Sequence, residues 1–219
     1  MAVDIKKCEI KIIVDSREQV WSHIEGAFKR NKIDYYVAKS KEGKKCLEVG
    51  DYSIIVKTPK GNILDFRKYV AVERKGSLNE FSGNLSDSKT LDEAGDNRII
   101  RELTKGLENK TRLMVLVEEE DGYNKAINGF FRWDKASKLK PQAFMGMMWS
   151  WEDRYNFKLK FCERKDDSWH MMYKYLYYVV RNFLKDFDES LLKDWSKEFK
   201  GAKDNYYYIN GDFEYLKGR

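Results

Sequence analysis

Two carboxylates and a lysine stand at positions from which they can share one catalytic site. Asp51 follows a glycine in the pair Gly50-Asp51, and Glu73 and Lys75 flank Arg74 near the end of an apolar segment. Side chains alternate along a strand, so Glu73 and Lys75 are expected on one face and Arg74 on the other. If Asp51 lies at the bend of a neighbouring strand, both carboxylates and the ammonium meet at one sheet edge. Such oxygen ligands suit Mg²⁺ or Mn²⁺, which also accept phosphate oxygens.

The chemistry available to this set is the hydrolysis of a phosphodiester. A bound metal can lower the pKa of a water ligand and polarise the scissile phosphate. Lys75 can position or deprotonate that water, or it can stabilise the charge that gathers in the transition state. Asp15 is a further candidate, because it ends the apolar run at 9–15 and a buried carboxylate is costly without a partner or a metal. The alternative is that Glu73 and Lys75 form an ordinary ion pair at a solvated strand end.

Composition is compatible with a folded protein that binds a polyanion. The chain has 219 residues, of which 42% are hydrophobic and 15% aromatic, enough to fill a core. The formal net charge of +6 agrees with nucleic-acid binding, but many other soluble proteins carry as much. No signal peptide and no apolar run of about 18 residues occurs, so no membrane association is expected.

The cysteines and histidines argue against a disulfide framework and against a zinc site. Cys8, Cys46 and Cys162 are scattered, which predicts reduced thiols and a cytoplasmic protein, or one in the host-cell cytoplasm if a phage encodes it. His23 and His170 have no familiar zinc-ligand spacing relative to these cysteines. A bound metal would therefore be held by carboxylates.

The order of predicted elements places the candidate residues in a mixed α/β sheet. Apolar and β-branched runs predict strands at 9–15, 33–39, 46–49, 52–57, 63–66, 69–74, 112–117 and 157–162. Helical spacing predicts helices at 16–31, 77–85, 98–107, 141–155 and 167–184, the first capped by Ser16 with Gln19 three residues on. This order favours an α/β sandwich in which helices flank a mixed central β-sheet. Residues 1–187 form the expected domain, and 188–219 form a helical, then Tyr-rich, C-terminal extension.

Three segments, in this order, resemble the nuclease domain of the XPF family, the structure-specific endonucleases of DNA repair and recombination within the PD-(D/E)XK superfamily. They are VDSRE at 14–18, GDY at 50–52 and VERK at 72–75. Arg98 and the segment REL at 101–103 resemble the family's arginine-bearing helix, and 113–118 resembles its following strand. The likeness covers roughly residues 9–185.

The resemblance implies a restriction-endonuclease-like core and a role for each matching residue. Asp51 and Glu73 are expected to bind Mg²⁺ or Mn²⁺, with Asp15 and Glu18 completing the acidic pocket. Lys75 is the expected catalytic lysine. For Glu18, an ion pair with its neighbour on the first turn of a helix is the competing interpretation.

The same resemblance assigns arginines to the nucleic acid and leaves oligomeric state open. Arg17, Arg74, Arg98 and Arg101 are expected to contact nucleic acid, with Arg17 and Arg98 either on phosphates or bracing the carboxylates. DNA is the expected partner, RNA is not excluded, and a homodimer through the nuclease domain is possible.

The sequence departs from the family pattern in two respects. Asn79 occupies the place of the aspartate that follows Glu-Arg-Lys after three residues, which leaves any ligand role there in doubt, and Glu80 is a candidate substitute. The tandem helix-hairpin-helix domain, through which cellular members pair and grip branched DNA, has no counterpart in these residues. The chain is most similar to compact phage or mobile-element members.

The predicted function is metal-dependent cleavage of DNA that is branched, flapped or partly single-stranded. The alternatives are a catalytically inactive nucleic-acid-binding protein on the same fold and a protein-interaction module with an aromatic surface. Two basic clusters can follow a phosphate backbone or form solvated faces: lysines 39, 41, 44 and 45, and lysines 135, 138 and 140. The polar segment 86–96 is predicted to be a loop.

Overall fold

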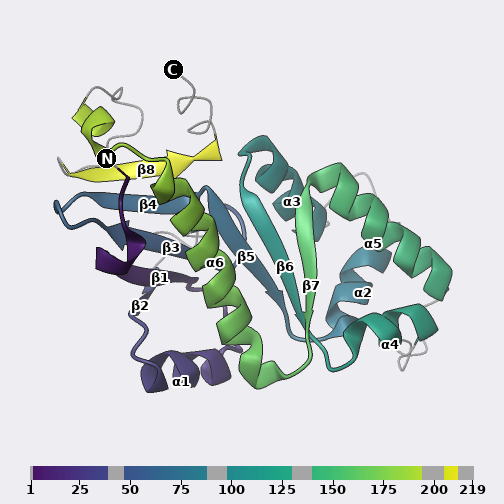
Figure 1. Ribbon diagram of the computed structural model, residues 1–219. Helices are drawn as coiled ribbons and strands as arrows, with labels where there is room; N and C mark the ends of the chain where they lie inside the picture. The colour runs from purple at the N-terminus through teal and green to yellow at the C-terminus, as the bar shows by residue number, and fades with distance from the viewer. Residues whose placement is uncertain (1, 39–46, 88–97, 130–139, 194–204, 212–219) are drawn as a thin grey trace.

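The computed structural model describes residues 2–38, 47–87, 98–129, 140–193 and 205–211, which build one mixed sheet with helices on both faces (Figure 1). The strands are β1 Glu9–Asp15, β2 Tyr35–Ala38, β3 Tyr52–Lys57, β4 Ile63–Lys68, β5 Val70–Lys75, β6 Arg112–Glu118, β7 Phe157–Cys162 and β8 Tyr206–Asn210. The helices are α1 Ser22–Arg30, α2 Leu78–Asp87, α3 Arg98–Glu108, α4 Gly122–Asn128, α5 Pro141–Tyr155 and α6 Ser168–Lys185, with 3-10 turns at Ile5–Lys7, Lys165–Asp167 and Glu189–Lys193.

The sheet is mixed, as predicted. Its main path runs β2-β1-β3-β5-β6-β7, and β4 and β8 continue from β3 as a branch. Strands β5, β6 and β7 pair in parallel, whereas β3 is antiparallel to β1, β4 and β5. The carboxyl ends of β1, β5, β6 and β7 and the amino end of β3 therefore lie along the same edge of the sheet.

Two hydrophobic layers hold the helices to the sheet. Helix α6 lies across one face and packs on β3, β5 and β6, with Leu176 and Val180 fully buried (Figure 1). On the opposite face, α2, α3 and α5 pack on β5, β6 and β7, around Phe81 and Phe144. Each large apolar side chain buried in this way contributes roughly 1.5–3 kcal/mol. Because helices pack on both faces, the strand ends that carry the candidate residues are held in fixed positions.

Two sequence expectations near the site are wrong, and both involve Asp15. The first helix begins at Ser22 rather than after Ser16, because the Asp15 carboxylate accepts the main-chain N–H of Arg17 (2.9 Å) and forms a turn there. Residues 47–49 form a bend rather than a strand, because Leu47 N donates to Asp15 Oδ2 (3.2 Å) instead of to a neighbouring strand.

Helix α4 and strand β8 are elements that the sequence did not predict. Strand β8, which is the Tyr-rich segment near the C-terminus, pairs in parallel with β4. The Tyr206 hydroxyl donates to the buried Asp65 (2.5 Å), and Glu189 accepts from Asn62 Nδ2 (2.6 Å) in the turn between β3 and β4. These contacts attach the described part of 188–219 to the β3–β4 hairpin. Within the described ranges, no helix combines the length and apolar character needed to cross a membrane.

Candidate active site

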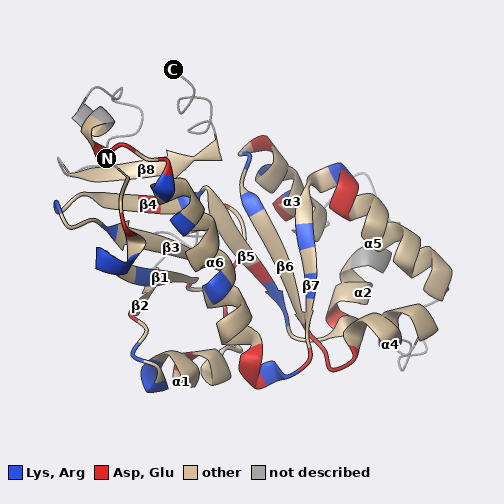
Figure 2. Ribbon diagram, in the orientation of Figure 1, with Lys and Arg blue, Asp and Glu red and all other residues tan. Residues whose placement is uncertain are grey.

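Strand β5 presents Glu73 and Lys75 on one face of the sheet, as the alternation of side chains requires. Every residue of β5 is buried, and acidic and basic positions lie side by side along it (Figure 2). Glu73 is 2% exposed and Lys75 is 5% exposed, and Lys75 Nζ donates to Glu73 Oε1 at 3.0 Å. Glu73 and Lys75 therefore form a buried ion pair, and the alternative of a solvated ion pair at the strand end is wrong.

Asp51 is held beside β5 by two hydrogen bonds with the main chain of that strand. Its N–H donates to Val72 O (2.8 Å), and its Oδ2 accepts the N–H of Arg74 (2.9 Å). Gly50 makes this approach possible, because it adopts φ +74° and a Cβ there would lie 2.8 Å from Val72 O. Glu102, from α3, accepts the Gly50 N–H at 3.3 Å. Because Tyr52 pairs with Val72, Asp51 lies across from Glu73 on the neighbouring strand.

The charges around Lys75 favour its ammonium form. Burial lowers the pKa of Lys75, but the nearby carboxylates of Glu73, Glu80 and Asp51 and the hydrogen bond that Lys75 donates to Glu73 outweigh it, so the pKa lies above the ordinary lysine value. Asn79 and Glu80 are both exposed, and Glu80 Oε1 lies 3.8 Å from Lys75 Nζ. Glu80, rather than Asn79, thus supplies negative charge to the site. In its ammonium form Lys75 can stabilise a developing negative charge.

The donor set fits a hard divalent cation that needs few protein ligands. Among the described residues, no group of three or more acidic, histidine or cysteine side chains is arranged to hold a metal. Asp51 and Glu73 nevertheless supply two carboxylates at the same buried strand end. Mg²⁺ is commonly bound by one or two carboxylates, with waters and substrate phosphates completing the octahedron. The residues present therefore fit Mg²⁺ or Mn²⁺ better than a metal that requires a full protein cage.

Asp15 lies at the same edge but its carboxylate supports the chain. Its N–H donates to Asp51 O (2.8 Å), so the ends of β1 and β3 are joined. Its two carboxylate oxygens accept the main-chain N–H groups of Arg17 and Leu47. Asp15 is fully buried, and these bonds provide the partners that such a carboxylate requires.

Arg74 and Glu18 do not share the face of Glu73 and Lys75. The Arg74 guanidinium donates to Glu18 Oε1 (2.7 Å), to Glu118 Oε2 (2.8 Å) and to Val20 O (2.9 Å). His23 Nε2 lies 2.7 Å from the second oxygen of Glu118. Glu18 is thus engaged by an arginine on the opposite face from the Glu73–Lys75 pair. Glu18 was expected in the acidic pocket with Asp51 and Glu73, but in the structure it pairs with Arg74.

The arginines expected to contact nucleic acid differ in their exposure. Arg17 is 44% exposed in its side chain, and Arg101 is exposed on α3, so both can reach a ligand. Arg74 is 8% exposed and is held by two carboxylates, so in this conformation it cannot contact a phosphate. The side chain of Arg98, the lysines at 39–45, Lys135 and Lys138, and most of the loop at 86–96 lie outside the described residues.

Sequence reasoning missed three residues that organise the site: Glu102, Glu118 and His23. Glu118 carried a usable signal, because it ends an apolar strand in an acid just as Asp15 does. Glu102 lies beside the apolar residue Leu103 on α3 and is 7% exposed, but its partner is more than fifty positions earlier in the chain. Such long-range pairings leave no local pattern.

Comparison with known proteins agrees with this geometry. The sequence pattern of the ERCC4 domain matches residues 14–175. XPF from Aeropyrum pernix has a similar fold, with a TM-score of 0.52 and 14% identity over 88% of this chain and 75% of that one. The same protein in complex with DNA gives a TM-score of 0.51 and 14% identity over 87% and 76%. No curated protein sequence matches the chain. Because the domain pattern spans most of the sequence, the chain belongs to the ERCC4 domain family.

Proposed function

We propose that this protein is a metal-dependent endonuclease that hydrolyses phosphodiester bonds in DNA. The observation that carries the proposal is the convergence of Asp51, Glu73 and Lys75 at one buried strand end within an ERCC4 domain. Two carboxylates are seldom buried close together unless a cation or a metal ion compensates their charge, because the cost of desolvation is large.

Each residue of the site has a role that follows from its position. Asp51 and Glu73 hold the divalent metal, which when bound supplies a Lewis acid for the scissile phosphate and an acidified water. Lys75, kept protonated by its carboxylate neighbours, stabilises the charge that gathers on the phosphate oxygens. Glu80 helps to hold Lys75 in place. Asp15 and Glu102 position the turn that bears Asp51.

DNA is the proposed substrate, and branched, flapped or partly single-stranded DNA the proposed class. One solved structure with this fold is XPF in complex with DNA, which supports a DNA partner. The net charge of +6 also favours a polyanion. The preference for branched DNA rests on the family's known substrates. Self-association remains a prediction, which light scattering after size-exclusion chromatography would test.

A cleavage assay tests the proposal. Purified protein is incubated with labelled flap, fork, duplex and single-stranded oligonucleotides in Mg²⁺, Mn²⁺ or EDTA. The variants Asp51→Asn and Glu73→Gln remove the carboxylate charge with little change in volume, and Glu120→Gln is the matched control, because Glu120 is an exposed acid beyond β6. Calorimetric titration of each protein with Mn²⁺ measures metal binding independently of turnover.

The expected result is metal-dependent cleavage that Asp51→Asn and Glu73→Gln reduce by at least a hundredfold, together with weakened Mn²⁺ binding. Loss of one catalytic group commonly costs a factor of this order. Glu120→Gln should cleave normally. DNA binding without cleavage in any metal would contradict the enzyme and favour a non-catalytic nucleic-acid-binding protein. Absence of both binding and cleavage would favour a protein-interaction module.

A further inference from the structure

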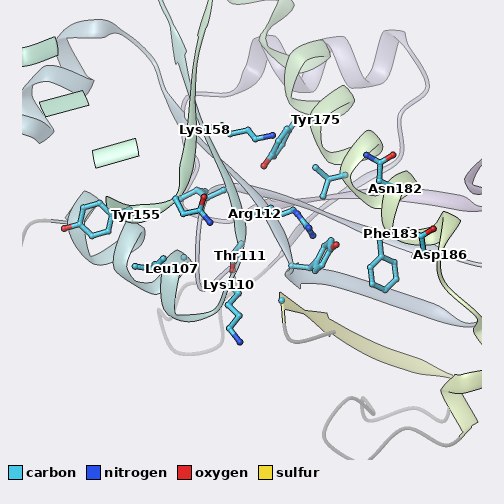
Figure 3. Close-up of a pocket in the computed structure, with 16 residues that line it drawn as sticks. Leu107, Lys110, Thr111, Arg112, Tyr155, Lys158, Tyr175, Asn182, Phe183 and Asp186 are labelled. Atoms are coloured by element: carbon cyan, nitrogen blue, oxygen red, sulfur yellow. The ribbon is translucent and has the colours of Figure 1, made fainter. Parts of the chain in front are cut away.

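A second concave site lies at the opposite end of the sheet from Asp51, Glu73 and Lys75. It has a volume of about 770 Å³ and is formed where β6 and β7 begin, between α3, the end of α5 and α6 (Figure 3). Pockets for small organic ligands usually measure 300–1,000 Å³, so the space suits a ligand of nucleotide size. None of the residues that line it belongs to the candidate active site. The proposed nuclease function does not use it.

Two pairs of a cation and an aromatic ring line this cavity. The Arg112 guanidinium lies over the ring of Tyr69, 4.6 Å from its centroid, and Lys158 Nζ lies 5.8 Å from the ring centre of Tyr175. Figure 3 shows Lys158, from β7, extending toward Tyr175 on α6, with Arg112, from β6, on the same cavity wall. Three basic side chains and one acidic side chain line the cavity, so its field favours an anion.

Tyr175 stays neutral at physiological pH. Burial raises the pKa of Tyr175 to about 12, although the nearby charge of Arg112 acts in the opposite direction. A neutral phenol does not repel a phosphate, and its ring presents a flat surface. Flat aromatic surfaces next to cations are the combination with which proteins hold unpaired bases and their phosphates.

We propose that this cavity binds a nucleotide unit of a single-stranded nucleic acid, with its phosphate at Lys110, Arg112 and Lys158 and its base against the partly exposed rings of Tyr155 and Tyr175. The exposed rim residues Lys110, Lys158 and Asn182 leave the cavity open to a continuous strand. The site thereby gives the protein a second contact with nucleic acid, separate from the one at which the bond is cut.

The sheet sets the distance between the two sites. Strand β6 has seven residues, begins with Arg112 at the cavity and ends with Glu118, which is bonded to Arg74 next to the active site. At about 3.3 Å per residue this is roughly 20 Å. A strand stacked as in a duplex, with a rise of about 3.4 Å per nucleotide, covers this distance in about six nucleotides. This part of the inference rests on the proposed nuclease function.

Binding is tested first, without metal, so that catalysis plays no part. Fluorescence anisotropy in EDTA measures the affinity of the full chain for a labelled oligo(dT) of 20 nucleotides at several salt concentrations. The test variant is Lys110→Gln/Lys158→Gln. The matched control is Lys160→Gln, because Lys160 is exposed two residues along the same strand and does not line the cavity. Asn182→Glu, which adds a negative charge at the rim, is a second test variant, and thermal melting confirms that each variant is folded.

In Lys110→Gln/Lys158→Gln the slope of log K against log salt should become less negative by about 1.4, because each lost phosphate contact to a single strand removes about 0.7 from its magnitude. The affinity of this double variant at low salt should fall on the order of tenfold, Asn182→Glu should also bind more weakly, and Lys160→Gln should match the unmodified protein. Equal affinities for all four proteins would overturn the proposal. Tight binding of free thymidine triphosphate that oligo(dT) does not displace would overturn the assignment to a strand.

Cleavage then tests the spacing. Flap substrates with unpaired arms of 2 and 12 nucleotides are compared in the presence of metal. The double variant should cut the long-arm substrate more slowly and the short-arm substrate at the normal rate. Equal slowing of both substrates would contradict the 20 Å separation. If binding behaves as expected but no substrate is cut, the nuclease proposal fails and the cavity assignment stands.

Discussion

The ion network around Arg74 allows a quantitative test of how this fold holds its site. In the variant Arg74→Met the aliphatic part of the side chain is kept and the charge is removed. Three hydrogen bonds are lost, to Glu18, to Glu118 and to Val20 O. The side chains of Glu118 and Glu18 are 0% and 8% exposed, so water cannot replace the guanidinium. The variant leaves two buried carboxylates without their cation.

The expected loss of stability is large. Removing one partner of a buried ion pair costs about 3–5 kcal/mol, because the remaining charge is uncompensated. The stability of a domain is typically about 5–15 kcal/mol, so the loss is a substantial part of the whole. For a chain of 219 residues, each kcal/mol corresponds to about 2–4 °C in Tm, which gives a decrease of roughly 6–20 °C. His23 remains bonded to Glu118 and keeps the loss toward the lower end.

Urea unfolding at pH 7, followed by circular dichroism, measures the free energy of unfolding. Lys57→Met is the matched control, because Lys57 pairs with Glu9 at 2.8 Å but the two side chains are 47% and 75% exposed. Exposed pairs contribute only about 0–1 kcal/mol. If Arg74→Met costs no more than Lys57→Met, the network does not hold the strand end together and the reasoning is refuted.

A triple variant separates the structural role of Arg74 from a role in DNA binding. Glu18→Gln and Glu118→Gln, added to Arg74→Met, remove the orphaned charges, and most of the lost stability should return. Because Arg74 is buried, oligonucleotide affinity should then equal that of the unmodified protein. A stable triple variant with weakened DNA binding would restore the sequence-based expectation that Arg74 contacts nucleic acid.

Two further substitutions test the turn at the site and the C-terminal strand. Gly50→Ala places a Cβ 2.8 Å from Val72 O at φ +74°, so it should displace Asp51, lower cleavage by more than tenfold and lower Tm; normal activity would show that the turn tolerates the shift. Tyr206→Phe removes the hydrogen bond to the buried Asp65 and should cost about 1–2 kcal/mol in urea unfolding. An unchanged midpoint would mean that this hydrogen bond contributes nothing to stability.

Elements with strong local signals were predictable from the sequence. Helix α5 and strand β7 have the predicted bounds, Pro141–Tyr155 and Phe157–Cys162. Proline at the first helical turn and Asn156 in the left-handed region define the two ends of α5. Strand β6 is a continuous apolar run, as expected for a parallel strand buried on both faces.

Elements that depend on distant partners were not predictable. Strand β8 reads YYYIN, in which tyrosines occupy both faces, so no alternation is visible although Tyr207 and Ile209 are buried. Its partner β4 lies about 140 positions earlier in the chain. The first helix was placed too early, because the capping pattern at Ser16 competes with a turn held by Asp15. Local propensity decided neither case.

The candidate site also has features that local sequence predicts and features that depend on distant residues. The pairing of Glu73 with Lys75 and the separation of Arg74 follow from strand alternation alone, and the structure shows both. The proximity of Asp51 depended on the strand order, which the sequence only suggested. The destination of Glu18 could not be predicted, since it depends on a guanidinium contributed by another strand.

Strand β5 serves both sides of the sheet at once, and this constrains how its sequence can change. Glu73 and Lys75 face the site, while Arg74 between them faces the buried network. Because the side-chain period of a strand is two, inserting or deleting one residue upstream within β5 would exchange the faces. The Arg74 guanidinium would then face the candidate site, and the charges of Glu73 and Lys75 would face the ion network of Glu18 and Glu118. Single substitutions in β5 change one side chain at a time, whereas a change in its length would shift the whole strand. The register of β5 with β3 and β6 therefore matters to the site as much as its side chains do.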